Sequence, residues 1–398
     1  MTDFPGKDEK KPETPADAAA ASDLTRFRPP LVLPEKVRNI LVVKLSSFGD
    51  AVMSLPFLAA TKARFPEAKI DWVAEKTVCQ LLEGHPLLNS VIRFPKEELK
   101  KSLKSLNLFE FFKVLGEHKK NLRKTRYDLV FDLQGLFKSG LQTRWARSER
   151  KLGFDKGREF AWVFLTHRLP PYNPDMLAIE RYLLPAKAVG WKEDGDFPEK
   201  AVFFPKEEDL SEADRLLADT PGPRVCLALG TRWKSKHWPV GHFAELAKLL
   251  AAEGVRSIAT GDPGEKPLEE AFAKCLDPGI PATKLVGKTS PGVLAAVFAK
   301  SDLAVSADSG PLHLAAAVRA NTLALFGPTR PERVAPVAKN SVVLRAPDMD
   351  CLGCLKRECP LDRKPTCMEA LSPELVFREA MRALRAPRRN PDGTPTVP

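Results

Sequence analysis

The sequence predicts an α/β protein made of two doubly wound domains that face a central cleft. Short apolar runs alternate with segments of helical periodicity along most of the chain, which is the pattern of parallel βαβ units. A turn-rich stretch at residues 191–206 divides this alternation into two series. The chain also has 398 residues, which is more than one hydrophobic core usually contains.

The first series lies at residues 37–190. Near-continuous apolar runs predict buried strands at residues 37–45, 70–74, 91–94, 127–133 and 152–154. Helical spacing predicts helices at residues 50–65, 77–82 and 176–189, with another helix start near residues 134–139. Since parallel strands are joined by crossover helices, these elements predict an N-terminal α/β domain.

The second series lies at residues 207–386 and predicts a C-terminal α/β domain. Its strands are expected at residues 225–229, 256–259, 283–286, 303–306 and 322–326, and its helices at 240–252, 265–275, 291–299 and 311–318. Residues 1–36 and 387–398 are rich in Pro and charge and have no periodicity. We therefore expect two disordered tails.

The composition is that of a globular protein, with 43% hydrophobic and 28% charged residues. No apolar run reaches the roughly 18 residues of a spanning helix, and the N-terminus lacks the apolar core of a signal peptide, so we expect a cytoplasmic protein. The formal charge of +11 favours a phosphate-bearing partner. Nucleic acid is not expected, because the basic residues are not interleaved with a nucleic-acid-binding motif.

Residues 95–126 carry most of the clustered positive charge. Leu and Phe recur there at near-helical spacing, and Lys and Arg occupy the positions between them. Such a basic amphipathic segment can lie on an anionic membrane surface. The other interpretation is a crossover helix that covers the sheet and exposes a solvated lysine face.

The loop at residues 46–50 follows the first predicted strand. Ligands of open α/β sheets bind at the carboxyl ends of the strands, so Ser46 and Ser47 point to a binding site. Asp50 has two interpretations, because it can cap the next helix or accept a proton from a substrate hydroxyl.

A second polar set lies in the same half of the chain. Gln134, Lys138 and Arg158 combine an amide with two cations, which suits a phosphorylated or carboxylated acceptor.

Two loops of the second half are suited to a phosphate-bearing ligand. Thr231 and Lys236 belong to a cationic loop directly after a strand, which indicates either a diphosphate clamp or a solvated basic turn. After another strand, Ser309 and Gly310 offer backbone donors at a helix start.

Two further residues of the second of these loops can act on a ligand or only on the helix. Asp308 would face a hydroxyl or a cation, or simply cap the helix, and His313 could bind phosphate or only pack. The loops contain neither the dinucleotide nor the P-loop glycine signature.

Four of the seven cysteines, Cys351, Cys354, Cys359 and Cys367, cluster near the C-terminus. The C-x2-C spacing suits a structural zinc ion. A disulfide staple and free thiols are the alternatives.

Several motifs together resemble glycosyltransferase family 9, the bacterial lipopolysaccharide heptosyltransferases and their relatives. They are KLSSFGDAVMSLP at 44–56, DLQGLFKS at 132–139, TRWKSKHWP at 231–239, SADSGPLHLAAA at 306–317, LFGPTRPER at 325–333 and the cysteine pattern. The resemblance covers residues 37–385. It implies a GT-B fold and an inverting transfer from a nucleotide sugar, typically ADP-L-glycero-D-manno-heptose, to a lipid-linked inner-core acceptor.

The resemblance also implies a role for each loop. Asp50 resembles the general base, and residues 37–190 the acceptor-binding domain. Residues 207–386 resemble the nucleotide-sugar domain, in which the donor-binding residues would be Thr231, Lys236, Asp308, Ser309, Gly310 and His313. The acceptor-binding residues would be Ser46, Ser47, Gln134, Lys138 and Arg158.

No cofactor is expected for catalysis on this interpretation, and a zinc ion at the cysteine cluster would be structural. The acceptor would be an anionic lipid-linked saccharide at the inner face of the inner membrane, with residues 95–126 in peripheral contact with that membrane. Three alternatives remain open. The protein could be a family 9 transferase for another nucleotide sugar, a sugar-nucleotide epimerase on a similar fold, or a non-enzymatic membrane-surface protein.

Overall fold

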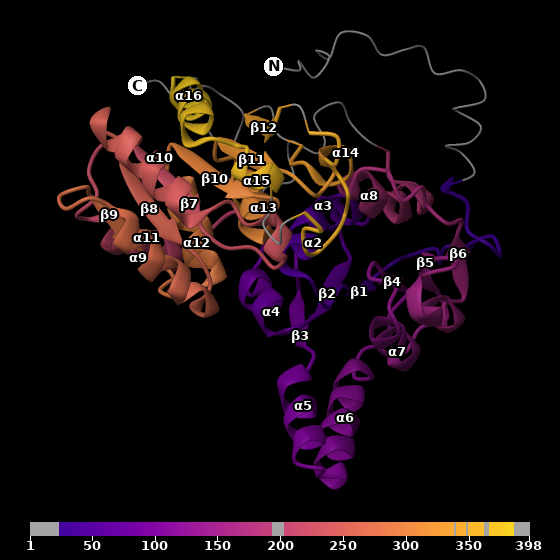
Figure 1. The fold of residues 1–398 in the computed structure, drawn as a ribbon. Helices are drawn as coiled ribbons and strands as arrows, with labels where there is room; N and C mark the ends of the chain where they lie inside the picture. The colour runs from indigo at the N-terminus through magenta and orange to yellow at the C-terminus, as the bar shows by residue number, and fades with distance from the viewer. Residues whose placement is uncertain (1–23, 193–202, 338–339, 348, 362–365, 386–398) are drawn as a thin grey trace.

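Two six-stranded parallel sheets organise the structure, one in each half of the chain (Figure 1). The computed structural model describes residues 24–192, 203–337, 340–347, 349–361 and 366–385. The first sheet has the strand order β3-β2-β1-β4-β5-β6. Its strands are β1 (Asn39–Val43), β2 (Lys69–Ala74), β3 (Ser90–Arg93), β4 (Leu129–Asp132), β5 (Lys151–Phe154) and β6 (His167–Leu169).

The second sheet repeats this topology. Its order is β12-β11-β10-β7-β8-β9, so that β7 and β10 take the central places that β1 and β4 have in the first sheet. The strands are β7 (Arg224–Ala228), β8 (Arg256–Thr260), β9 (Ala282–Lys284), β10 (Leu303–Ala307), β11 (Thr322–Phe326) and β12 (Ser341–Arg345). In a doubly wound sheet the ligand lies at the switch in strand order, outside the carboxyl ends of these two central strands.

Helices cover both faces of each sheet. In the first half they are α2 (Phe48–Met53), α3 (Leu55–Arg64), α4 (Lys76–Leu82), α5 (Lys96–Lys104), α6 (Leu108–Leu122), α7 (Phe137–Trp145), the 3-10 helix η1 (Arg158–Phe164) and α8 (Ala178–Ala188). Alternate residues of a strand face opposite sides of a sheet. Ile40 therefore packs in a cluster with α3 and α8, whereas Leu41 packs with α6.

The second half is layered in the same way. Its helices are α9 (Glu207–Leu217), η2 (Lys234–Lys236), α10 (Val240–Ala252), η3 (Pro263–Glu265), α11 (Lys266–Cys275), α12 (Pro291–Ala299), α13 (Gly310–Ala317), α14 (Pro331–Val334), α15 (Thr366–Glu369) and α16 (Pro373–Leu384). Cys226 packs with α9 and α12, and Leu227 packs with α10 and α16. The predicted α/β class is therefore confirmed.

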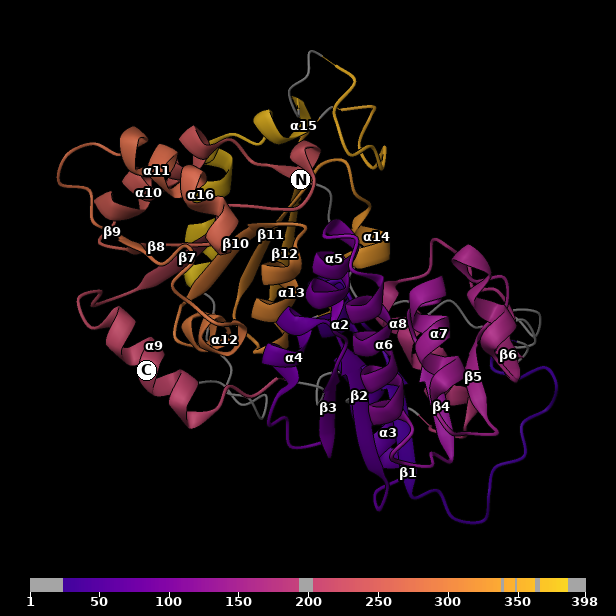
Figure 2. The same ribbon diagram turned by 90° about the horizontal axis from the view of Figure 1, so that it is seen from below.

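Several predicted boundaries need correction. The helix predicted at residues 50–65 begins at Phe48 and is divided at Ser54 into α2 and α3. Residues 95–126 were predicted as one amphipathic segment, but they form two helices, α5 and α6, joined by a turn at residues 105–107. This α5–α6 hairpin projects from the N-terminal half in Figure 1, and Figure 2 looks onto it from below.

The predicted N-terminal tail is also too long. Residues 1–23 lie outside the described residues, but Phe27 is buried and Arg28 exchanges backbone hydrogen bonds with Arg168 of β6. Residues 24–36 thus belong to the N-terminal domain. The predicted C-terminal tail at 387–398 lies outside the described residues, and so do residues 193–202 of the predicted linker at 191–206. Phe203 is buried, and α9 begins at Glu207.

The two halves meet through the N-terminal ends of α2 and α13. A side chain built on Gly310 would lie 2.6 Å from the Phe48 ring, and one built on Gly49 would lie 3.2 Å from the Gly310 Cα. Only glycine permits this close backbone approach. Arg330 of the second half also pairs with Asp175 of the first at 3.2 Å. Within the described residues, no helix has both the length and the apolar character needed to cross a membrane.

Candidate active site

Asp50 lies three residues into α2, where the loop after β1 becomes a helix. The helix cap is Ser47, whose hydroxyl donates a 2.7 Å hydrogen bond to Asp50 Oδ2. The other carboxylate oxygen, Oδ1, accepts a 2.9 Å bond from the Tyr182 hydroxyl on α8. Asp50 is therefore oriented from both sides and is not the N-cap residue, which was one of its two interpretations.

The charge of Asp50 is balanced by a buried lysine. Lys44 directly follows β1 and has 4% of its surface exposed, and its Nζ donates a 3.0 Å bond to the Tyr182 hydroxyl. Burial opposes ionisation of Asp50, but Lys44, Ser47 and Tyr182 outweigh it and hold the carboxyl pKa below its ordinary value. A carboxylate that stays ionised and fixed in direction is suited to accept a proton.

Gln134 joins the loop after β4 to the loop after β1. Its Oε1 accepts hydrogen bonds from the backbone N–H groups of Leu45 (2.7 Å) and Ser46 (3.0 Å), and its Nε2 donates to the Ser46 hydroxyl. Asp132 holds this loop in place by accepting the N–H of Gln134 at 2.9 Å. The two loops at the switch in strand order thus form one polar surface.

Lys138 contributes the positive charge of this surface. Its Nζ donates 3.2 Å to the Ser46 hydroxyl and forms a 2.6 Å ion pair with Glu75, which follows β2. Glu75 also pairs with Lys96 at the start of α5. Ser46, Gln134 and Lys138, three of the predicted acceptor-side residues, are therefore brought together.

Arg158 is the one predicted acceptor-side cation that does not join these residues among the described contacts. It is exposed at the start of η1, and the described residues give it no hydrogen bond or ion pair with Ser46, Gln134 or Lys138. Its neighbour Glu159 accepts the N–H of Phe137 at 3.0 Å, which places η1 beside α7.

On the C-terminal half, Lys236, Asp308 and His313 form a second cluster. Lys236 Nζ lies 3.2 Å from Asp308 Oδ2, and His313 Nε2 lies 3.6 Å from Asp308 Oδ1. Burial opposes ionisation of Asp308, but His313 and Lys236 outweigh it and lower the carboxyl pKa to about 2. The parallel pairing of Ala228 with Ser306 explains why these two loops meet.

Thr231 presents a buried hydroxyl to the same cluster of loops. Its Oγ1 is buried without a hydrogen-bond partner among the described residues, whereas its carbonyl accepts a 2.7 Å bond from His237. A buried hydroxyl without a partner costs free energy unless a ligand satisfies it. Lys236 also lies 5.0 Å from the centre of the Trp233 ring, which restricts where the ammonium group can go.

The contact between α2 and α13 places the two clusters on opposite sides of one interface. Gly49 adjoins Asp50, and its built side-chain position lies 3.2 Å from His313 Cδ2. Gly310 packs against Phe48, and the Ser309 hydroxyl bonds to Ser306 at 2.9 Å. Gly49, the neighbour of Asp50 in α2, therefore lies against His313 of the second cluster.

The segment that carries Cys351 and Cys354 is held against the loop after β11 by backbone hydrogen bonds. The N–H groups of Gly353 and Leu355 donate to the carbonyls of Gly327 and Pro328, and a side chain built on Gly327 would touch the sulfur of Cys367. All four cysteines, Cys351, Cys354, Cys359 and Cys367, are free thiols. Within the described residues, no three potential ligands are grouped closely enough to hold a metal ion.

Sequence reasoning missed the residues that support the site. Lys44 was predicted only as part of the strand at residues 37–45, and Tyr182 only as part of the helix at residues 176–189. Both are recognised only because the fold brings Tyr182 next to Asp50, 132 residues away. A lysine within an otherwise apolar buried strand was the one signal available beforehand.

The fold and this site define a two-domain glycosyltransferase. Residues 115–364 match the family model for glycosyltransferase family 9 (heptosyltransferase). Lipopolysaccharide heptosyltransferase 1 of Pseudomonas aeruginosa is 31% identical over 368 residues, covering 88% of this chain and 99% of the relative. The Escherichia coli K12 enzyme of the same name is 31% identical over 315 residues, covering 78% and 94%.

The chain belongs to glycosyltransferase family 9. Among solved structures, Escherichia coli heptosyltransferase WaaC with ADP is 27% identical, with a TM-score of 0.67 over 87% of this chain and 99% of that one. A family 9 glycosyltransferase from Veillonella parvula shares the fold at 19% identity, with a TM-score of 0.74 over 89% and 99%. Family membership confirms the predicted GT-B class and favours a transferase over an epimerase or a non-enzymatic protein.

Proposed function

We propose that this protein transfers a heptose, with inversion, from ADP-L-glycero-D-manno-heptose to the inner core of a lipopolysaccharide acceptor. The relatives named lipopolysaccharide heptosyltransferase 1 support this reaction, and so does WaaC, solved with ADP and with ADP-2-deoxy-2-fluoro heptose. The observation that carries the proposal is the α2–α13 contact. In this contact Gly49, the neighbour of Asp50, lies against His313, which with Lys236 and Asp308 forms the cluster of the C-terminal half.

Asp50 acts as the general base. Its carboxylate removes the proton of the acceptor hydroxyl while the hydroxyl oxygen forms a bond to the anomeric carbon. The bond from that carbon to the diphosphate oxygen breaks, and its electron pair leaves with the nucleoside diphosphate. Tyr182 and Ser47 hold the carboxylate in position for this step.

Lys236 and Thr231 bind the donor diphosphate. The Lys236 ammonium stabilises the negative charge that develops on the leaving group. The Thr231 hydroxyl, which is buried and without a partner among the described residues, donates to a phosphate oxygen. Asp308 and His313 face the sugar hydroxyls, with Ser309 and Gly310 shaping the start of α13.

Ser46, Ser47, Gln134, Lys138 and Arg158 bind the acceptor. Lys138 is paired with Glu75, so it supplies a positioned donor and not a free positive charge. The acceptor is an anionic lipid-linked saccharide, and the protein meets it at the inner face of the inner membrane through residues 95–126.

Mass spectrometry of turnover tests this proposal. Purified protein is incubated with ADP-heptose and a series of Kdo-lipid A acceptors. The expected product has gained one heptose, and the amount of product depends on both substrates. Turnover of another nucleotide sugar in preference to ADP-heptose would contradict the donor assignment, and product formed without an acceptor would contradict transfer.

A structural zinc ion at the cysteine cluster is a separate proposal. It is supported by the C-x2-C spacing and by the hydrogen bonds that hold residues 353 and 355 near Cys367. We expect about one zinc per chain in protein purified without chelator, a lower content in Cys354→Ser, and no change in the control Cys275→Ser. A zinc content near zero in the parent protein would end this proposal.

A further inference from the structure

The outer end of the α5–α6 hairpin is unusually apolar for an exposed surface. Five large side chains, each 51–85% exposed, lie within ten residues: Leu103, Leu106, Leu108, Phe109 and Phe112. The outer end of the hairpin projects beyond both sheets in Figure 1, and no element of the described chain covers it. A cluster of exposed apolar side chains marks a surface that contacts another protein, a ligand or a membrane.

The outward face of α6 changes character along its length. Phe109, Phe112, Gly116, Lys120 and Arg123 recur every three or four residues and therefore share one face of the helix. The opposite face, with Phe111, Leu115, His118 and Leu122, packs toward the sheet. The exposed face is thus aromatic at the outer end and cationic at the inner end.

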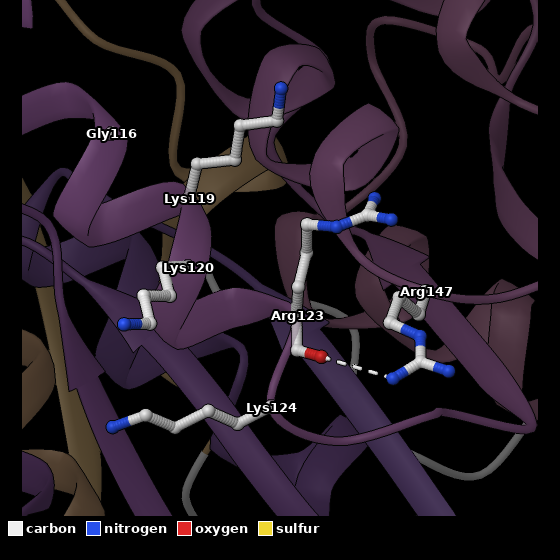
Figure 3. Close-up of a pocket in the computed structure, with 6 residues that line it drawn as sticks. All are labelled: Gly116, Lys119, Lys120, Arg123, Lys124 and Arg147. Atoms are coloured by element: carbon white, nitrogen blue, oxygen red, sulfur yellow. Dashed lines mark hydrogen bonds between the residues drawn. The ribbon is translucent and has the colours of Figure 1, made fainter.

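The inner end of this face forms a cationic hollow, shown in Figure 3. It has a volume of about 510 Å³ and is lined by Gly116, Lys119, Lys120, Arg123 and Lys124 of α6 and by Arg147 of the loop after α7. Arg147 Nη1 donates to the carbonyl of Arg123 at 3.4 Å, and Arg123 Nη1 donates to that of Trp145. These bonds fix both guanidinium groups beside each other.

The positive charges of the hollow are not balanced by acids. In the described part of the chain, none of its five cations forms an ion pair with a carboxylate. Neighbouring like charges repel, and a bound anion relieves that repulsion. The field reaches Lys151 nearby, whose pKa is lowered by burial and then by the positive charges of Arg144 and Arg123.

The distance between the apolar outer end and the cationic hollow suits the depth of a bilayer interface. With a rise of 1.5 Å per residue, the hollow lies roughly 10–15 Å along α6 from Phe112. Apolar faces of interfacial helices enter a membrane by about 5–10 Å. A hairpin that inserts its outer end would therefore hold the hollow at the level of the lipid head groups.

We propose that the α5–α6 hairpin is a two-part membrane anchor, whose apolar end enters the bilayer and whose cationic hollow binds the phosphate of an anionic phospholipid. This inference rests on the membrane contact included in the proposed function and names the lipid class and the residues. Duplex nucleic acid would account for the cations but not for the exposed apolar side chains on the same helix face. The charge also fits, since residues 95–126 contain ten cations and four acids, which gives +6 of the total +11.

Vesicle co-sedimentation of the full chain tests the anchor. Vesicles are made of phosphatidylcholine with or without phosphatidylglycerol. The parent protein is expected to bind only the vesicles that contain phosphatidylglycerol, and salt should weaken that binding. The triple variant Leu106→Ser/Phe109→Ser/Phe112→Ser should lose most of the bound fraction. The triple variant Lys119→Glu/Lys120→Glu/Arg123→Glu should lose the preference for phosphatidylglycerol.

Matched controls separate these effects from general changes in the surface. Phe204→Ser removes an exposed aromatic residue, with 54% of its surface accessible, from the C-terminal half. The triple variant Lys274→Glu/Lys284→Glu/Lys288→Glu makes the same change in net charge on exposed lysines of that half. Both controls should bind vesicles like the parent. Thermal unfolding and ADP binding show whether each hairpin variant is folded.

Each other outcome of the vesicle experiment overturns the anchor. If the Leu106/Phe109/Phe112 variant binds vesicles like the parent, the outer end of the hairpin has no role in binding. If the Lys119/Lys120/Arg123 variant keeps the preference for phosphatidylglycerol, the hollow does not bind the lipid phosphate. Binding of duplex DNA without binding of vesicles makes nucleic acid the partner.

Transfer to a deacylated, soluble acceptor is measured separately without vesicles. Loss of the anchor with intact transfer refutes this inference alone, and loss of transfer with intact vesicle binding refutes the proposed reaction alone.

Discussion

The Tyr182 hydroxyl donates a 2.9 Å hydrogen bond to Asp50 Oδ1 and accepts a 3.0 Å bond from the buried ammonium of Lys44. The three groups form a chain in which the lysine charge acts on the carboxylate through the phenol. This relationship connects the core of the N-terminal domain to the group proposed as the base.

Tyr182→Phe should shift the pH dependence of turnover. Ionised Asp50 is the active form, so activity falls as the pH drops through the carboxyl pKa, which lies below its ordinary value. Removing the Tyr182 hydrogen bond raises that pKa, and the acidic limb of the kcat profile therefore moves to higher pH. We also expect a loss of about tenfold in kcat at neutral pH from weaker positioning. The control Tyr172→Phe, a nearby tyrosine without a bond to Asp50, should keep the parent profile; identical profiles for both variants would refute the role of Tyr182.

Asp50→Asn should remove turnover while leaving donor binding intact. The amide keeps the shape of the side chain but cannot accept a proton, so we expect kcat to fall by about 10²–10⁴. Isothermal titration with ADP checks the donor site, and thermal unfolding checks the fold. The melting temperature should fall modestly, because Lys44 loses its nearby negative charge. Substantial turnover by the folded variant would exclude Asp50 as the base.

Thr231→Val should have opposite effects on stability and on donor binding. The Thr231 hydroxyl is buried without a partner among the described residues, so replacing it with a methyl group removes a desolvation cost of about 1–3 kcal/mol. The ligand-free protein should therefore unfold at a higher temperature, and its affinity for ADP should fall. Thr61→Val is a matched control, because the Thr61 hydroxyl is buried in α3, also without a described partner. The control variant should stabilise the protein without weakening its binding of ADP. Weaker ADP binding in both variants would refute the donor-binding role of Thr231.

Asp308 should make stability depend on pH in the acidic range. Its pKa is lowered from 3.8 to about 2 in the folded protein. A carboxyl with a lowered folded pKa contributes stability above its unfolded pKa and loses it as the pH falls through the folded one. The window is therefore about pH 4 to 2, and the contribution is about 2 kcal/mol. Urea unfolding at several pH values should show a smaller acid dependence in Asp308→Asn; an unchanged dependence would contradict the role of Lys236 and His313.

Gly310→Ala should disturb the contact between the two halves. The added methyl group would lie 2.6 Å from the Phe48 ring, so the ring must turn away or one of the helices α2 and α13 must move. We expect a lower kcat and a lower melting temperature. Gly241→Ala in α10 is the control, since a side chain built there meets no atom within 4 Å. Parent-like turnover by Gly310→Ala would show that this contact does not position the site.

Local sequence patterns identified most of the fold. The apolar runs of β1, β4, β7, β10 and β11 are buried central strands, so their hydrophobicity was unambiguous. Two edge strands were missed. β6 has only three residues and no apolar run, whereas β12 contains the short run Val342–Leu344 but is only partly buried at every position. The break between α5 and α6 was missed because Leu106, with φ of 53°, continues the leucine spacing through the turn.

The candidate site shows the same division. Sequence alone singled out Asp50, Lys236, Asp308 and Thr231, because polar side chains at the ends of buried strands have a restricted set of uses. The order of these strand-end loops along the chain also came from the sequence. Their partners could not be found in this way, since a hydrogen bond between distant residues leaves no local trace.

The sequence by itself determined the α/β class, the family and the loops that carry polar chemistry, because hydrophobic period and loop composition are local properties of the chain. Only the tertiary structure decided that Tyr182 and Lys44 control Asp50, and that Gly49 meets Gly310 between the domains. Those contacts depend on how helices far apart in the chain pack on two separate sheets. Packing geometry of that kind is set by the whole fold and not by any one segment.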